Sequence, residues 1–187
     1  EEKHGLEHNP YLELPRMNIL TYDLNKMLPE YIEVADSAFN FKEFFRVWTG
    51  DTSVDGREMP NNKKIGDFIH EEDVMKFLNL MCKKSENSNY PFSKDEFIEN
   101  FRHTFWIVPG VKEAKALTKM LRNHPNYQMF KIVNVAGTGD ENGYEALDAV
   151  RNAIGKNPED TYTITISCGR LTTGVTVKEW TAVFYLA

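Results

Sequence analysis

The chain has 187 residues, of which 41% are hydrophobic and 12% aromatic, and its formal net charge is −6. This composition excludes an intrinsically disordered protein and supplies enough apolar side chains for one domain of ordinary size, with or without an appendage. The acidic balance also excludes a uniformly basic nucleic-acid-binding protein, although it leaves room for a local cationic strip.

Cysteine and histidine usage argues against a metal site or a disulfide framework. The two cysteines, Cys82 and Cys168, lie far apart without CxxC spacing, so we expect free thiols in a reducing compartment. The histidines show no ligand spacing, and no Ser/His/Asp or Cys/His arrangement can be argued. No apolar run reaches membrane-spanning length, and the first residues lack the apolar core of a signal peptide. We therefore predict a cytoplasmic protein with no membrane partner, no metal ligands and no catalytic residue of its own.

Residues 1–35 contain one strand-like run, "RMNILTYDL". Its alternation predicts a strand with Met17 and Ile19 on one face, and Tyr22 is an optional further member of that face. The rest of this stretch offers little for an independent core, so we expect a connecting segment.

Residues 36–103 follow the helical period instead. Asn40 is placed to cap a first helix, and Ser93 forms a capping pair with Glu96 for a later one. The turn-rich stretch 52–64 is expected to be a loop. Between them, "HEEDVMKFLNLMCKK" predicts an amphipathic helix with acids in its first turn and lysines in its last. The apolar positions of this helix are Val74, Phe77, Leu78 and Met81.

Residues 104–187 alternate strands with helices. Short apolar runs at 104–108, 130–135, 162–167 and 181–186 predict strands. Amphipathic patterns that begin at Val111 and Tyr144 predict the helices between them, with Gly155 as the stop of the second. Buried strands separated by helices indicate an α/β fold with a parallel sheet and right-handed crossovers.

Three loops follow strands and could bind a ligand, because ligands of open α/β sheets sit at the carboxyl ends of the strands. They are Pro109-Gly110, residues 137–140 and residues 168–176. The motif "GTGDENG" in the second loop lacks the lysine of a phosphate-binding loop, and its acids would repel a phosphate. We favour a plain acidic turn there.

The loop at 168–176 suits a phosphodiester. Arg170 could pair with a phosphate, the hydroxyls of Thr172 and Thr173 could bind one without reading sequence, and Gly174 would allow close approach of a backbone. The alternative is that the threonines favour extended structure and Gly174 marks a bulge. The residues alone leave both interpretations open.

Together, these stretches resemble the second RecA-like domain of superfamily 2 helicases and translocases, in the restriction-enzyme (type III restriction-like) branch. "HTFWIVPGVKEAKAL" is similar to motif IV, "FKIVNVAGTGDENG" to the second strand and its loop, and "TITISCGRLTTGVTVKEWTAVFYL" to motif V with the strand that follows. "LPRMNILTYDL" resembles the segment that crosses from the first RecA-like domain. The resemblance implies a RecA-like parallel sheet that stops after the motif V strand. It divides the chain into a crossover segment (1–35), a helical insertion (36–103) and a partial second RecA-like domain (104–187).

The resemblance also implies roles for the loop residues. Motif IV and motif V loops hold the backbone of one nucleic-acid strand, and motif V also faces ATP. Gly174 and Thr176 would lie on the nucleotide side, although Thr176 stands where the family often has an Asp. The implied nucleic-acid contacts are Pro109, Gly110, Val111, Cys168, Arg170, Thr172 and Thr173.

The family's phosphate loop, DExH box and arginine-rich motif VI are absent from this sequence. We therefore expect a fragment of an ATP-dependent DNA helicase or translocase of a restriction-modification system, inactive alone and with no tightly bound cofactor. ATP and Mg²⁺ would belong to the longer protein. The implied partners are DNA, the first RecA-like domain and a methyltransferase or specificity subunit. A doubly wound small-molecule or nucleotide-binding domain and a protein-interaction module remain as alternatives.

Overall fold

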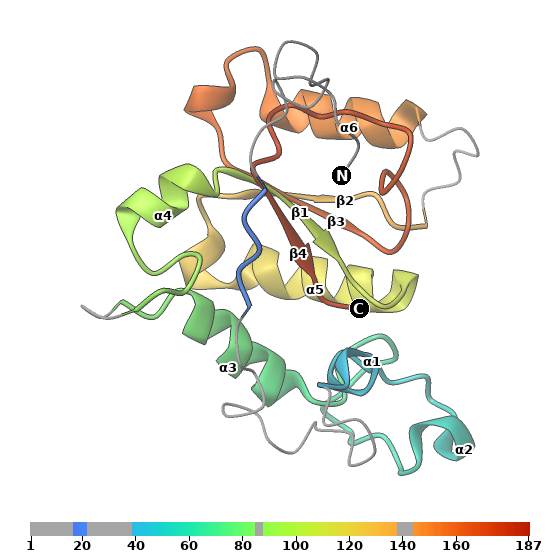
Figure 1. Cartoon of the computed structure of the whole chain (residues 1–187). Coiled ribbons are helices and arrows are strands. Elements are labelled where there is room, and N and C mark those ends of the chain that lie inside the picture. The colour runs from blue at the N-terminus through green and yellow to red at the C-terminus, as the bar shows by residue number, and fades with distance from the viewer. Residues whose placement is uncertain (1–16, 22–38, 85–87, 138–143) are drawn as a thin grey trace, which may run out of the picture.

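The structure is a computed structural model, and it describes residues 17–21, 39–84, 88–137 and 144–187 (Figure 1). Among these residues, the helices are too short or too polar to cross a bilayer.

A parallel sheet forms the centre of the molecule. Its strands are β1 (His103–Ile107), β2 (Lys131–Asn134), β3 (Thr163–Ser167) and β4 (Ala182–Tyr185), in the order β2-β3-β1-β4. All of the pairings are parallel, and every residue of the central strand β3 is buried. The predicted α/β class is confirmed, and the arrangement is consistent with a RecA-like fold.

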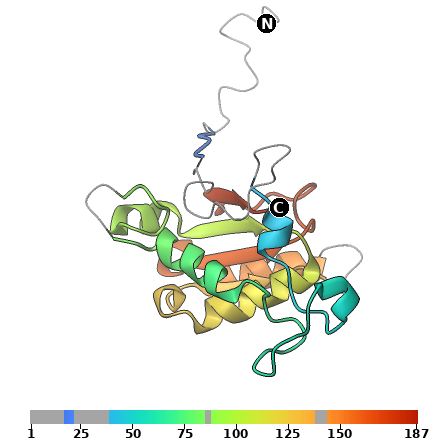
Figure 2. The same cartoon turned by 90° about the horizontal axis from the view of Figure 1, so that it is seen from below.

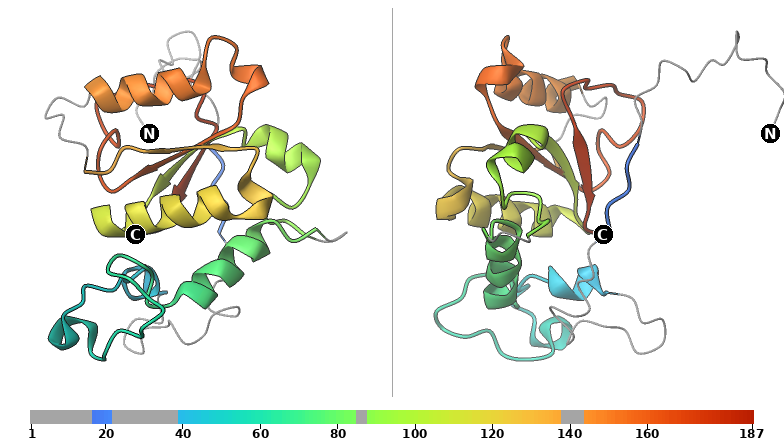
Figure 3. Two further views of the ribbon diagram at one scale, coloured as in Figure 1. Left: turned by 180° about the vertical axis from the view of Figure 1, so that it is seen from behind. Right: turned by 60° about the vertical axis from the view of Figure 1, so that its left-hand side comes forward.

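The helices predicted between the strands cover both faces of the sheet. Helix α5 (Val111–Asn123) follows β1 and helix α6 (Tyr144–Ile154) follows β2, and Figures 1 and 3 show them on opposite sides. Short 3₁₀ turns, η4 (Pro125–Tyr127) and η5 (Pro158–Asp160), lead into the next strands. Gly155 ends α6 as predicted, because its φ of +83° lies in the left-handed region that glycine tolerates.

No helix connects β3 to β4. The connection at 168–181 crosses the α6 face of the sheet as an irregular segment and covers it with side chains. The Trp180 ring stacks on Phe105 with a centroid distance of 4.4 Å. Leu171 and Val177 pack with the inner face of α6 in a small second core. The segment therefore covers this part of the α6 face of the sheet, as a connecting helix would.

The helical region contains α1 (Phe41–Phe44), α2 (Thr52–Asp55), α3 (Glu71–Met81) and α4 (Asp95–Asn100). The cap predicted at Asn40 is present, since its Oδ1 accepts the Glu43 N–H at 2.8 Å. The capping pair at Ser93 is wrong: α4 begins after Lys94, and the Ser93 hydroxyl donates to the Tyr90 carbonyl at 2.8 Å.

The expected loop at 52–64 is wrong at its start, where α2 forms. The Asp51 side chain caps this short helix by accepting the Ser53 N–H, and Gly56 ends it at φ +74°. The buried Asp55 then accepts hydrogen bonds from the N–H groups of Thr49 and Gly50, which closes the segment on itself.

The helical region and the sheet share one core. Figure 2 shows α3 and α5 side by side on the same side of the sheet, and the Tyr127 hydroxyl donates to the Leu78 carbonyl at 3.2 Å. The aromatic ring of Phe92 contacts the rings of both Trp106 and Phe184. One continuous cluster therefore includes, with no exposed surface, Phe44, Phe45, Val74, Leu78, Trp106, Leu117, Leu121, Ile164 and Ile166.

The structure describes residues 17–21 of the strand expected around residues 17–22. Residues 17–21 have no strand pairing, and Met17 and Ile19 are 83% and 76% exposed. A strand is defined by backbone hydrogen bonds to a neighbouring strand, and residues 17–21 form no such ladder with the other described residues. Tyr22 lies outside the described residues.

Candidate nucleic-acid interface

The loops after β1 and β3 begin side by side. The two strands are adjacent and parallel, and the Val108 N–H donates to the Ser167 carbonyl at 2.9 Å just beyond them. Both loops therefore leave the sheet at its carboxyl edge, where ligands of open α/β sheets bind. We call residues 109–111 and 168–173 the strand-end rim.

The first half of the rim is the turn into α5. Pro109, Gly110 and Val111 are half-buried, and Gly110 is the extended residue that precedes the helix. The side chain of Glu113 folds back over Gly110, so that a Cβ at this position would collide with the Glu113 carboxylate. Another residue here would displace the flexible Glu113 side chain, which places a negative charge beside the amino end of the helix.

The loop after β2 reaches the same edge. Gly137 has a φ of +68°, and a Cβ added there would lie 2.5 Å from Cγ1 of Val111. The rest of the "GTGDENG" motif, including its acids, lies outside the described residues.

The second half of the rim is held by its own hydrogen bonds. The Ser167 hydroxyl donates to the Arg170 carbonyl at 2.7 Å, and the Thr172 hydroxyl donates to the Gly169 carbonyl at 2.6 Å. The Thr172 hydroxyl therefore already donates its only proton inside the loop, and it could donate to a phosphate only after the loop rearranges. Thr173 is exposed next to it.

The electrostatics of the rim are mixed. Burial raises the pKa of the Cys168 thiol, and the Glu113 carboxylate raises it further, while Arg170 acts in the opposite direction. The thiol therefore stays protonated near neutral pH and is a poor nucleophile. Glu113, which lies next to the strand-end rim, was not singled out from the sequence. Its position three residues after the residue that precedes a helix is nevertheless a known signal for a carboxylate that turns back toward the helix start.

The residues assigned to the nucleotide side lie farther along the crossover. Thr176 lines a groove of about 410 Å³ together with Arg151 and Gly155, where α6 ends. Because α6 runs antiparallel to the strands, its end lies toward the amino edge of the sheet. The structure thus gathers 109–111 and 168–173 at one edge and places Thr176 elsewhere.

Neither this groove nor a second one is at the strand-end rim. The second groove, of about 510 Å³, lies between the helical region and η4 and is lined in part by Cys82, Phe92 and Phe130. Within the part of the chain that the structure describes, no group of three or more acidic, histidine or cysteine side chains could hold a metal ion.

No family model matches the chain, and no solved structure matches it. The chain is similar to a protein of Mycoplasma pneumoniae (strain ATCC 29342 / M129 / Subtype 1) that bears the provisional name of a type II restriction enzyme and methyltransferase C-terminus. The two are 26% identical over 198 aligned positions, which include 99% of this chain and 27% of that relative. The chain therefore spans about a quarter of the relative's length.

Proposed function

We propose that the chain is part of a restriction-modification protein, in which it supplies the second RecA-like domain of an ATP-dependent DNA translocase. In this proposal, the strand-end rim contacts the phosphodiester backbone of one DNA strand. The observation that carries it is the match of almost the whole chain to the Mycoplasma pneumoniae protein, whose name includes a restriction enzyme.

The fold supports the same assignment. A parallel sheet with two adjacent loops at its carboxyl edge is the arrangement that a backbone-binding domain of this class requires. Arg170 would supply a charged donor, Thr173 a neutral one, and the backbone at Pro109, Gly110 and Val111 would border the strand. Cys168 and Thr172 would contribute through the shape of the loop.

The nucleotide would be handled mainly by other parts of the longer protein. The resemblance assigns Gly174 and Thr176 to one wall of the ATP cleft, but Thr176 lies beside Arg151 toward the amino edge of the sheet, so this part of the proposal rests on the resemblance alone. The sequence lacks the phosphate loop and the DExH box of the family, so in this proposal ATP and Mg²⁺ are bound mainly by the other parts of the longer protein. We therefore derive no hydrolytic step from this chain. The first RecA-like domain and a methyltransferase or specificity subunit remain the proposed protein partners, in the cytoplasm.

The proposal is tested by the DNA-stimulated ATPase activity of the longer protein. Arg170→Ala combined with Thr173→Ala removes the charged and the free neutral donor of the rim, so the DNA concentration for half-maximal stimulation should rise about tenfold. The matched control is Arg57→Ala with Thr52→Ala, two exposed residues of the helical region, and it should behave as wild type. Wild-type stimulation by the rim variant, with an unchanged circular dichroism spectrum, would contradict the proposed role of the rim.

A further inference from the structure

Strand β4 has an open edge. It is the last strand in the order β2-β3-β1-β4, and the Leu186 N–H donates to the Ile107 carbonyl of β1 at 2.8 Å. Backbone groups alternate sides along a strand, so the N–H and C=O groups of Val183 and Tyr185 point away from β1. The side chains of these two residues are 61% and 68% exposed. An edge that is both unpaired and apolar is a site for the addition of a strand.

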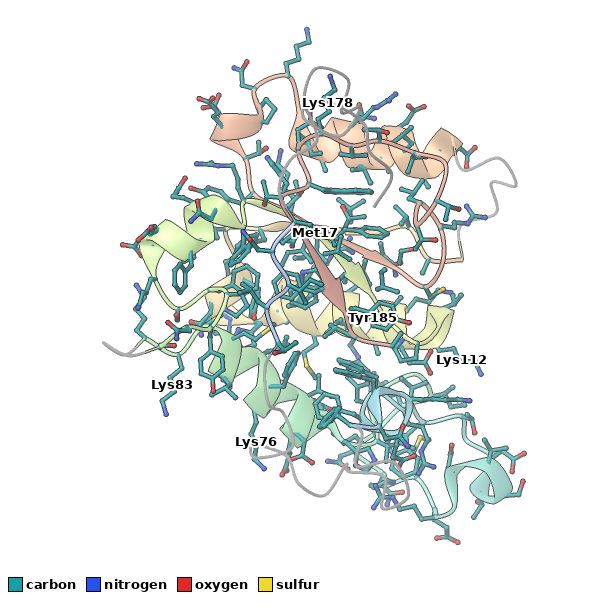
Figure 4. The ribbon with its side chains drawn as sticks, viewed as in Figure 1. Met17, Lys76, Lys83, Lys112, Lys178 and Tyr185 are labelled. Atoms are coloured by element: carbon teal, nitrogen blue, oxygen red, sulfur yellow. The ribbon has the colours of Figure 1, made fainter. Side chains whose placement is uncertain are left out.

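The segment 17–21 lies beside this edge. Figures 1 and 3 show it next to β4 and running in the same direction, and Figure 4 labels Met17 and Tyr185 on this side of the molecule. Figure 2 places it beyond β4, on the side away from β1. Of the large apolar side chains that are exposed among the described residues, most belong to this one region: Met17, Ile19, Leu20, Val183 and Tyr185.

The topology favours pairing between the two. The connection from β1 to β2 moves across the sheet through α5, and α3 lies on the same side of the sheet as α5 (Figure 2). A strand at 17–21 outside β4 would connect to β1 by moving across the sheet in the direction in which β1 connects to β2. Its connection would pass through the helical region, which lies on the α5 side of the sheet. The crossover would therefore have the right-handed sense that parallel strands show almost without exception.

From the open edge, the apolar segment beside it and this crossover sense, we infer that residues 17–21 are an edge strap: they add to β4 as a fifth, parallel strand and cover its free edge. The pairing would satisfy the outward backbone groups of Val183 and Tyr185 and cover part of the apolar surface of Met17 and Ile19, which share one face of a strand. It would also fix the first part of the chain to the sheet that carries the strand-end rim. The inference does not depend on the proposed function.

Amide hydrogen exchange of the 187-residue chain, followed by NMR, tests the strap. The N–H groups of Val183 and Tyr185 should exchange at least about 100-fold more slowly than those of an exposed, unpaired segment. Either the N–H of residue 18 or that of residue 19 would face β4, because backbone groups alternate sides along a strand. The double variant Asn18→Pro with Ile19→Pro removes both donors and should return the amides of Val183 and Tyr185 to rapid exchange. The amide of Leu186, which bonds to β1, should stay protected in both proteins.

The conservative variant Asn18→Thr with Ile19→Val is the control and should keep the protection, because both residues favour strands. Rapid exchange of Val183 and Tyr185 in the wild-type chain would overturn the strap. Protection that survives the proline variant and grows with protein concentration would also overturn it, and would assign the edge to a second copy of the chain.

Discussion

Glu113 sets the local charge of the strand-end rim, and its effect can be measured through Cys168. The carboxylate lies beside the thiol and adds to the effect of burial in raising its pKa. Glu113→Gln removes this charge, so the pKa of Cys168 should fall and alkylation by iodoacetamide should reach half its maximal rate at a lower pH. The pKa of Cys82, which burial raises at a distant site, should not change.

Mass spectrometry can follow both cysteines in one sample, which makes Cys82 an internal control. Glu72→Gln, on the exposed side of α3, is the matched variant and should leave both profiles as in the wild type. An unchanged profile for Cys168 in Glu113→Gln would show that the carboxylate does not lie where we place it.

His103 makes stability depend on pH near neutrality. Burial lowers the pKa of this side chain, and the hydrogen bond from its Nε2 to the Pro158 carbonyl offsets only part of that effect. A histidine with a lowered pKa binds fewer protons in the folded state than in the unfolded state. The free energy of unfolding should therefore fall as the pH drops from 7.5 to 5.5.

His124, whose pKa burial also lowers, should contribute in the same direction. Urea denaturation at pH 7.5 and pH 5.5 gives the free energy of unfolding at each pH. This free energy should fall less between the two pH values in His103→Gln than in the wild type. An equal loss in both proteins would remove His103 as a cause.

At the scale of elements, α3 joins the helical region to the sheet. Leu78 is fully buried in the shared core, and its carbonyl accepts the hydrogen bond of Tyr127. Leu78→Ala should lower the free energy of unfolding by about 2–5 kcal/mol, the usual cost of such a cavity. Asn79→Ala, on the exposed side of the same helix, should change it by less than about 0.5 kcal/mol. Equal effects in urea denaturation would contradict the packing of α3.

The sheet was predictable from the sequence because its elements carry strong periodic signals. The four strands are short runs rich in β-branched and aromatic residues, and α3, α5 and α6 place their apolar residues on one face. The predicted cap at Ser93 was wrong because the Ser93 hydroxyl donates a hydrogen bond to the Tyr90 carbonyl in the preceding turn. The pairing of residues 17–21 could not be predicted, because it depends on a distant partner that periodicity cannot reveal.

The same limit applies to the candidate site. Strand order decides which loops meet, and a sequence pattern carries no information on that order beyond general topology. The position of Thr176 beside Arg151 depends on the path of the connection at 168–181, which crosses the sheet without a helix. Glu113 was missed because its role arises from the fold of its side chain over Gly110.

At the scale of the whole molecule, the shared core predicts one cooperative unit. Amides of α3 and of β3 should open in the same global transition, with equal free energies of opening by native-state hydrogen exchange. Leu78→Ala should lower both values by the same amount, although it lies in the helical region. Unchanged values in β3 would mean that the helical region unfolds by itself.

The net charge of −6 predicts weak DNA binding by this chain alone. Few cations would meet phosphates at the rim, so few counterions would be released, and the affinity should fall only shallowly with salt. Fluorescence anisotropy with a labelled single strand at several salt concentrations measures the slope. A steep slope would require a basic surface that the described residues do not gather at the rim.

The most direct test of the central claim asks whether the strand-end rim touches the DNA backbone. The two half-buried cysteines suit this test, because Cys168 lies on the rim and Cys82 lines the distant groove. Burial raises the pKa of both thiols, so the reaction is run above about pH 8 and the two cysteines can be compared with each other. DNA that carries a tether ending in an activated pyridyl disulfide on one backbone phosphate can cross-link to whichever cysteine it approaches, because the cysteine thiolate attacks the tether sulfur and releases pyridinethione. We predict cross-linking at Cys168 that competing untethered DNA suppresses, with little at Cys82. Equal cross-linking of both cysteines, or cross-linking at Cys82 alone, would contradict the claim that this edge of the sheet holds DNA.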